Sequence, residues 1–227
     1  MPNTTIDLIV PVAPWDDIEP PFAAQFAGYR SGCLLVTGPK PPAHLSRMPN
    51  AQFVPSPLGR ARQLNAAAHR AKADYLWFVH ADTILPESYE LTLHGAIAQN
   101  PEALLYFDLG FSQEGPKLMA LNAAGVWFRS HVLQLPFGDQ ALCLPQKTFW
   151  QLGGFSEQAA YGEDHLLVWQ AHQKGVPLRP VGAKVTTSAR KYQNKGWATT
   201  TLQHVHLTIR QALPEAYKVL RRRRSPS

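Results

Sequence analysis

Three clusters of polar residues in this sequence have types and spacings that suit chemistry. The first, "GRARQLNAAAHRA", places Arg60, Gln63 and Asn65 in the opening turns of an expected helix. Guanidinium and amide donors there, added to the unpaired N–H groups of a helix start, suit a phosphate or a nucleobase. A solvated polar face on an alanine-rich helix explains the same pattern equally well, so both interpretations stay open.

The second cluster, "HADT", contains His80 and Asp82 and directly follows an apolar run. Hard cations such as Mg²⁺ or Mn²⁺ prefer carboxylate oxygens, and one or two protein carboxylates suffice when a diphosphate supplies further ligands. Asp82 therefore suits a metal site, with His80 as a second ligand or a hydrogen-bond partner. The alternative is a cap or turn acceptor before Pro86.

The third cluster, "YGEDHLL", opens a further expected helix with two adjacent carboxylates, Glu163 and Asp164. The positive end of a helix dipole favours ionised acids, so capping alone explains their placement. An ionised carboxylate beside a cleft is also what a general base needs to take a proton from a substrate hydroxyl. Such a base typically contributes about 10²- to 10⁴-fold to the rate.

The elements that must position these clusters alternate between strands and helices in the first half. Helices are predicted over residues 17–29 and 56–73, and strands over residues 5–12, 33–38, 52–54, 75–79 and 103–111. This alternation predicts a doubly wound α/β fold with a mostly parallel sheet. Ligands bind outside the carboxyl ends of such strands, which is where residues 79–82 would lie.

The second half of the chain is less regular. The predicted elements are a helix over 115–133, a short strand and short helix within 136–155, a helix over 162–176, a strand over 180–192, and one or two amphipathic helices over 196–220. Neither a repeat nor a linker is visible, so we expect one compact domain.

Composition narrows the class of protein. With 227 residues, 45% hydrophobic and 17% charged, the chain suits a soluble globular protein with a sizeable core. Cys33 and Cys143 lie too far apart for a metal knuckle, no apolar stretch is long enough for a membrane span, and no secretion signal is recognisable. These features predict a reduced, cytoplasmic location.

The net charge of +6 partly reflects a basic run, Arg221 to Arg224. A solvated terminus and a weak peripheral contact with anionic lipid both explain the run, and no nucleic acid partner is expected. The remaining chain is only mildly basic, which is compatible with a phosphate-bearing substrate.

Common catalytic signatures are absent. The sequence contains no GxxxxGK[ST], GxGxxG, HExxH, CxxC or GxSxG motif. His204 and His206, two residues apart in an expected helix, point to different sides and are interpreted as structural or surface residues.

In order, the segments "IVPVAPW", "GRARQLNAAAHRAKADYLWFVHADTILP", "GDQALCLPQKTFWQLGGF" and "GEDHLLVWQAHQKG" resemble the family 2 glycosyltransferases with a GT-A fold. They are most similar to a small bacterial subgroup whose metal motif reads HADT. The likeness covers most of residues 5–210. It implies a single GT-A domain with a donor half at about 1–112, an acceptor half at about 113–210, and a C-terminal helix and tail at 211–227.

The resemblance also implies an inverting transfer from a nucleotide-sugar donor to an acceptor hydroxyl. Asp82, beside His80, would hold Mn²⁺ or Mg²⁺ on the donor diphosphate, and Asp164 would be the general base with Glu163 as neighbour or substitute. Arg190, with Lys191, is either a diphosphate contact or part of a solvated basic loop. The implied donor-side residues are Pro11, Val12, Ala13, Arg60, Gln63, Asn65, His80, Ala81, Asp82, Gly138, Asp139, Gln140 and Arg190.

The chain departs from the family pattern in three places. Thr37 and Gly38 stand after the second strand, where an acidic pair that holds the nucleoside is common, and His80 replaces an aspartate. The QxxRW motif of processive enzymes is missing, which argues against polymer synthesis.

A decayed transferase fold acting as a binding module and a nucleotidyltransferase are the alternatives. The first is opposed by the joint presence of Asp82, Glu163 and Asp164, and the second by the glycine-free segment "VPVAPWDD".

Overall fold

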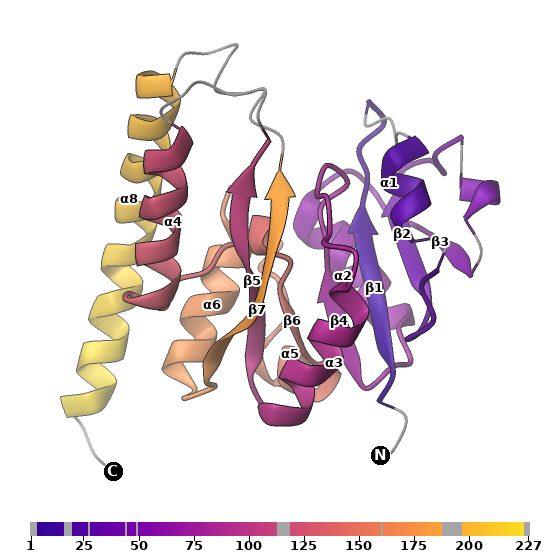
Figure 1. Cartoon of the computed structure of the whole chain (residues 1–227). Coiled ribbons are helices and arrows are strands. Elements are labelled where there is room, and N and C mark those ends of the chain that lie inside the picture. Colours follow the sequence, from indigo (N-terminus) through magenta and orange to yellow (C-terminus); the bar gives the residue numbers. More distant parts are fainter. Residues whose placement is uncertain are drawn as a thin grey trace.

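One seven-stranded sheet organises the chain in the order β3-β2-β1-β4-β6-β5-β7 (Figure 1). The computed structural model describes residues 4–15, 20–26, 28–43, 45–48, 50–112, 119–159, 161–187 and 197–224. The strands are β1 (Ile6–Pro11), β2 (Leu34–Gly38), β3 (Ala51–Pro55), β4 (Tyr75–Phe78), β5 (Leu104–Phe111), β6 (Cys143–Pro145) and β7 (Leu178–Thr187). Only β6 pairs antiparallel with its neighbours, β4 and β5.

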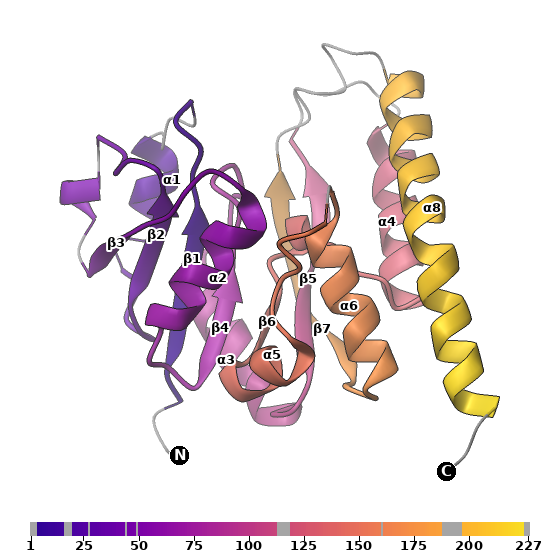
Figure 2. The same ribbon diagram turned by 180° about the vertical axis from the view of Figure 1, so that it is seen from behind.

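The central strands are buried on both faces, which explains their continuous apolar sequences. In β4, Tyr75 and Trp77 enter one core cluster while Leu76 and Phe78 enter the other. The first cluster is covered by α1 (Pro20–Gln25) and α3 (Tyr89–Gln99). The second is covered by α2 (Arg60–Arg70), α5 (Gln146–Leu152) and α6 (Glu163–Gln173), on the side shown in Figure 2.

Two further helices, α4 (Met119–His131) and α8 (Trp197–Arg224), lie beyond the β5–β7 end of the sheet (Figures 1 and 2). α4 contacts β5, and α8 contacts α6. Short 3₁₀ turns, η1 (Leu45–Arg47) and η2 (Gly138–Gln140), precede β3 and β6. None of the helices within the described ranges is long and apolar enough to cross a membrane.

A buried carboxylate, Asp7, ties three segments together at the amino end of β1. One carboxylate oxygen accepts the N–H of Cys33 at 2.8 Å, and the other accepts those of Lys72 and Ala73 at 2.8 and 3.2 Å. Asp7 thereby fixes where β2 begins and where the chain leaves α2 for β4.

The structure confirms the predicted α/β domain with its mostly parallel sheet, but it corrects several element boundaries. The helix expected over 17–29 ends at Gln25, because the chain turns inward so that Phe26 and Tyr29 enter the core. α3 was not anticipated from the sequence. The C-terminal segment, predicted as one or two helices over 196–220, is one helix with Pro214 inside it.

Candidate active site

The three polar clusters converge at the carboxyl edge of the parallel strands. His80 and Asp82 follow the end of β4, and Arg60 opens α2 after the end of β3. α6 precedes β7, so its first residues, Glu163 and Asp164, lie at the same edge. Because β6 runs the opposite way, the η2 turn that precedes it also lies there.

Arg60 joins the first and third clusters directly. Its Nε donates to Glu163 Oε1 in an ion pair, and its Nη2 lies 3.7 Å from Asp164 Oδ1. Both carboxylates are buried, whereas the Arg60 side chain is partly exposed, with a relative accessibility of 42%. The acidic pair therefore has a counter-charge within the protein, and that charge remains partly exposed to solvent.

The Asp164 carboxylate is fixed by backbone donors. Gly138 N–H donates to Oδ2 at 2.5 Å, and His165 N–H donates to Oδ1 at 2.9 Å. Burial alone would raise the pKa of Asp164, but the Arg60 guanidinium and the Gly138 N–H outweigh it, so the pKa is lowered. Asp164 is thus ionised and held in one orientation.

Residue 138 has to be glycine for this contact. A Cβ at Gly138 would lie 2.6 Å from Asp164 Oδ2, closer than real side-chain contacts allow. The absence of a side chain lets the η2 turn approach the carboxylate, so the segments "GDQ" (138–140) and "GED" (162–164) are in contact.

Asp139, a half-buried residue, adds a third carboxyl group to the cluster. Its Oδ1 is buried and has no hydrogen-bond partner among the residues that the structure describes. Burial raises the pKa of Asp139, opposed by the nearby Arg129 and His80. Burial and the Arg60 charge lower the pKa of His80. A buried acceptor without a protein partner is a position where a water, an ion or a ligand group could bind.

Three predicted donor-side amides have partners within the protein instead. Gln63 Nε2 donates to the carbonyls of Val12 and Thr37 at 2.6 and 3.2 Å, so it braces the ends of β1 and β2. Asn65 exchanges hydrogen bonds with the backbone of Phe155, and Gln140 is fully buried. The partners of Gln140 are Phe107 O, Ser130 Oγ, Arg129 Nη2 and Phe137 N.

A pocket of about 310 Å³ lies where β1 and β2 end, beside the predicted nucleotide segment at residues 11–13. Sequence analysis missed Trp15 and Lys40 in its wall. The signal for Lys40 was its place in the proline-rich loop immediately after β2, and the signal for Trp15 was its place shortly after β1. The lining residues are Val12, Ala13, Pro14, Trp15, Lys40, Pro41, Pro42 and Ala43. Arg190 and Lys191 lie outside the described residues.

The residues after β4 fit a cation shared with a diphosphate better than a preformed metal centre. Asp82 is exposed, and Ala81 is half-buried. Among the described residues, no group of three His, Cys, Asp or Glu side chains could hold a metal ion. A hard cation would therefore need ligands from a bound substrate in addition to Asp82.

Comparison with known proteins adds fold-level information. No protein-family model and no curated protein matches the sequence. Staphylococcus aureus TarS 1-349 with UDP-GlcNAc is similar at 13% identity and a TM-score of 0.58, over 82% of this chain and 58% of that one. The mannosyltransferase PcManGT from Pyrobaculum calidifontis, with GDP-Man and Mn²⁺, is similar at 14% identity and a TM-score of 0.66, over 92% and 64%.

The chain therefore has the mixed α/β fold of these glycosyltransferase structures. It spans about 60% of the length of the TarS 1-349 chain. The roles of the individual site residues stay predictions.

Proposed function

We propose that this protein is a metal-dependent, inverting glycosyltransferase of family 2, most similar to the subgroup with an HADT motif. It would transfer a sugar from a nucleotide-sugar donor to an acceptor hydroxyl. The observation that carries this proposal is the convergence of Arg60, Asp139, Glu163 and Asp164 at the carboxyl edge of the sheet. Carboxylates that can accept a proton thus meet a guanidinium that can neutralise a phosphate. They meet at the edge where α/β sheets bind ligands.

The pocket at the ends of β1 and β2 would take the nucleoside, with Val12 and Ala13 of the predicted segment 11–13 in its lining. Exposed Trp15 and Lys40 offer a ring face and a cation in place of the acidic pair that is common after the second strand. The diphosphate would extend toward Arg60 and Asp82. When bound there, with Asp82 and His80 as protein ligands, Mn²⁺ or Mg²⁺ would neutralise charge on the departing diphosphate.

Asp164 would take the proton from the acceptor hydroxyl, with Glu163 beside it. The oxygen of that hydroxyl attacks the anomeric carbon while the bond to the diphosphate breaks, so one displacement inverts the centre. A diphosphate that attracts Arg60 would weaken the Arg60–Asp164 pair. Loss of that counter-charge raises the pKa of Asp164, so donor binding makes the carboxylate a better base.

A binding or scaffold role is the second candidate, and one observation favours it. Thr37, buried at the end of β2, stands where the resemblance expects an acid. We also propose a cytoplasmic location, since both cysteines are free thiols.

Thermal unfolding with a panel of nucleotides and nucleotide-sugars, with and without Mn²⁺, tests the proposal. A ligand at 100 times its Kd should add about 2.7 kcal/mol of stability. Asp82→Ala should abolish the Mn²⁺-dependent part of that gain. Glu102→Ala, which removes an exposed acid at the opposite edge of the sheet, should leave it unchanged. If no nucleotide stabilises the protein, the enzyme proposal fails.

A further inference from the structure

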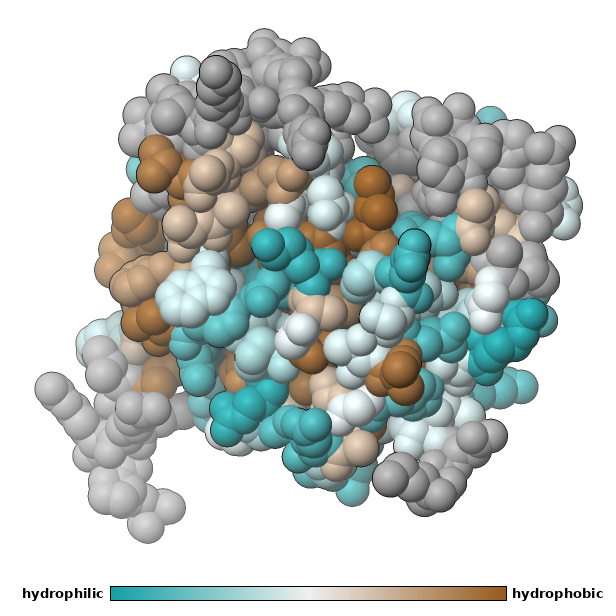
Figure 3. Space-filling view, viewed as in Figure 1, coloured by the Kyte–Doolittle hydropathy of each residue, from teal (hydrophilic) through white to brown (hydrophobic). Residues whose placement is uncertain are grey.

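Large apolar side chains are exposed along α4, the turn that follows it, and α8. We name this surface the α4/α8 face. Figure 3 shows hydrophobic residues gathered over these helices, while polar residues dominate the middle of the same view. The residues of the face are Leu121, Trp127, Phe128, Val132, Leu133, Ile209, Leu213 and Tyr217, each more than half exposed. Contiguous apolar surface of this kind marks an interaction site.

On α8 the exposed apolar residues recur every four positions. Ile209, Leu213 and Tyr217 are 52%, 66% and 66% exposed, which places them on one outward stripe. The adjacent side of α8 faces the protein, where Ala212 and Ala216 pack against the core and also line the groove beside the stripe. The three side chains of the stripe therefore remain exposed although the helix packs against the rest of the protein.

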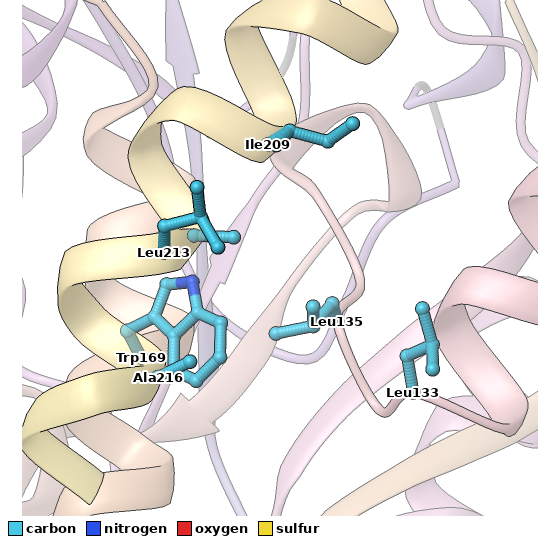
Figure 4. A pocket seen from close by; sticks show the side chains of 7 residues that line it. Leu133, Leu135, Trp169, Ile209, Leu213 and Ala216 are labelled. Carbon is cyan, nitrogen blue, oxygen red and sulfur yellow. The ribbon is translucent and has the colours of Figure 1, made fainter.

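A groove connects this stripe to the turn after α4. It has a volume of about 290 Å³, and Figure 4 shows Ile209 and Leu213 on one side and Leu133 and Leu135 on the other, above Trp169. Its lining is apolar throughout, so the two helices present one continuous surface.

The charge of α8 indicates which kind of partner suits the α4/α8 face. α8 contains six basic residues, Arg210, Lys218 and Arg221 to Arg224, and one acid, Glu215, which gives it +5 of the chain's net +6. An amphipathic helix with aromatic and aliphatic residues on one stripe and a cluster of arginines suits the interface of an anionic bilayer.

We propose that the α4/α8 face docks on the surface of an anionic membrane. Apolar side chains would enter the boundary between headgroups and acyl chains, and the basic run would lie among lipid phosphates. A second copy of this chain would bring a second basic helix of the same charge to the contact, which is unfavourable.

Docking at this face would also bear on the candidate active site. Gln211, on the inner side of α8, pairs with His165 Nδ1 at 2.8 Å and donates to the carbonyls of Tyr161 and Gly162 at 3.0 Å each. These residues flank Glu163 and Asp164. The docked helix would therefore hold the acidic pair at a fixed position relative to the bilayer.

Vesicle flotation tests the proposal without any transfer reaction, so its result is independent of the proposed function. The full chain is mixed with phosphatidylcholine vesicles that contain or lack phosphatidylglycerol. We expect flotation with the anionic vesicles and at least about tenfold weaker binding to the neutral ones. Leu213→Glu should reduce anionic binding by about tenfold or more, and replacement of Arg221 to Arg224 by glutamine should remove the anionic preference.

Leu91→Glu is the matched control, because Leu91 is an exposed leucine on α3, outside the face. It should float like the wild type, and all variants should keep the wild-type melting temperature because the altered residues are exposed or at the helix end. The proposal is overturned if Leu213→Glu binds anionic vesicles as well as Leu91→Glu does. It is equally overturned if the wild type self-associates through this face and does not float.

Discussion

At the scale of single residues, the candidate site depends on a carboxylate that has both hydrogen-bond donors and a counter-charge within the protein. Asp164 accepts two backbone N–H groups and lies beside Arg60, while Asp139, one residue from Gly138, keeps an acceptor without a partner among the described residues. The two acids therefore differ in their surroundings, since one is held ionised and the pKa of the other is raised. Environments that push two pKa values apart indicate different chemical roles.

Asp164→Asn separates donor binding from transfer. The amide keeps the shape of the side chain but cannot take the acceptor's proton, so transfer should fall by about 10²- to 10⁴-fold while donor affinity stays within a few-fold. Initial rates and nucleotide titrations measure the two quantities. Loss of donor binding together with transfer would show that Asp164 is not the base.

Gly138→Ala tests the contact between the η2 turn and Asp164. The added methyl group would lie 2.6 Å from Oδ2, so the carboxylate or the turn has to move. Transfer should fall at least about tenfold, because small displacements of a catalytic group are costly. Gly95→Ala on α3, where no atom lies within 4 Å of the new Cβ, is the control and should leave the rate unchanged. Equal rates for the two variants would exclude a positioning role for Gly138.

At the scale of elements, α6 and α8 are joined by a buried histidine. Trp169 Nε1 donates to His165 Nε2 at 3.0 Å, so His165 Nδ1 carries the proton that it donates to Gln211 Oε1. A neutral imidazole therefore uses both ring nitrogens of His165, Nε2 as an acceptor and Nδ1 as a donor. A second proton would break the contact with Trp169, and this is consistent with a pKa that burial lowers.

This histidine should make folding sensitive to mild acid. The folded pKa lies below the ordinary value of about 6.5, so the unfolded chain binds a proton first, and stability falls as pH drops below about 6.5. His165→Gln should reduce the loss of stability between about pH 7.5 and 5.5, measured by urea unfolding. His172→Gln, later in the same helix, is the control. An unchanged pH dependence in His165→Gln would contradict the assignment.

At the scale of the whole molecule, the two edges of the sheet hold different kinds of polar groups. Asp7 ties β1, β2 and the chain after α2 at the amino edge, whereas the charged cluster gathers at the carboxyl edge. Asp7 satisfies three backbone N–H groups at the amino edge, whereas Asp139 Oδ1 at the other edge has no partner among the described residues. Substitutions at the amino edge should therefore affect stability, and substitutions at the carboxyl edge the proposed ligand binding.

Asp7→Ala should destabilise the fold by roughly 3 kcal/mol, because it leaves three backbone N–H groups without their acceptor. Asp74→Ala removes an exposed carboxylate nearby that accepts hydrogen bonds from Thr5, and it should cost less than about 1 kcal/mol. Urea unfolding of both variants gives the comparison. Similar losses for the two would show that Asp7 does not tie the segments.

The sequence alone determined the elements whose signal is local. The apolar runs of β1, β4 and β5 and the acidic start of α6 could be predicted, because strand burial and the preference of helix starts for acids depend on neighbours in the chain. The early end of α1 and the existence of α3 could not, because packing of Phe26, Tyr29 and Leu93 in the core decides them.

The residue types of the candidate site were likewise visible in the sequence, but their partners were not. Only the tertiary structure decided that Arg60 pairs with Glu163 across 103 positions, that Gly138 touches Asp164, and that Gln63 faces the backbone. Such contacts depend on which loops the sheet order brings to one edge. A single sequence determines its chemistry residue by residue, whereas the topology of the sheet determines which of those residues meet.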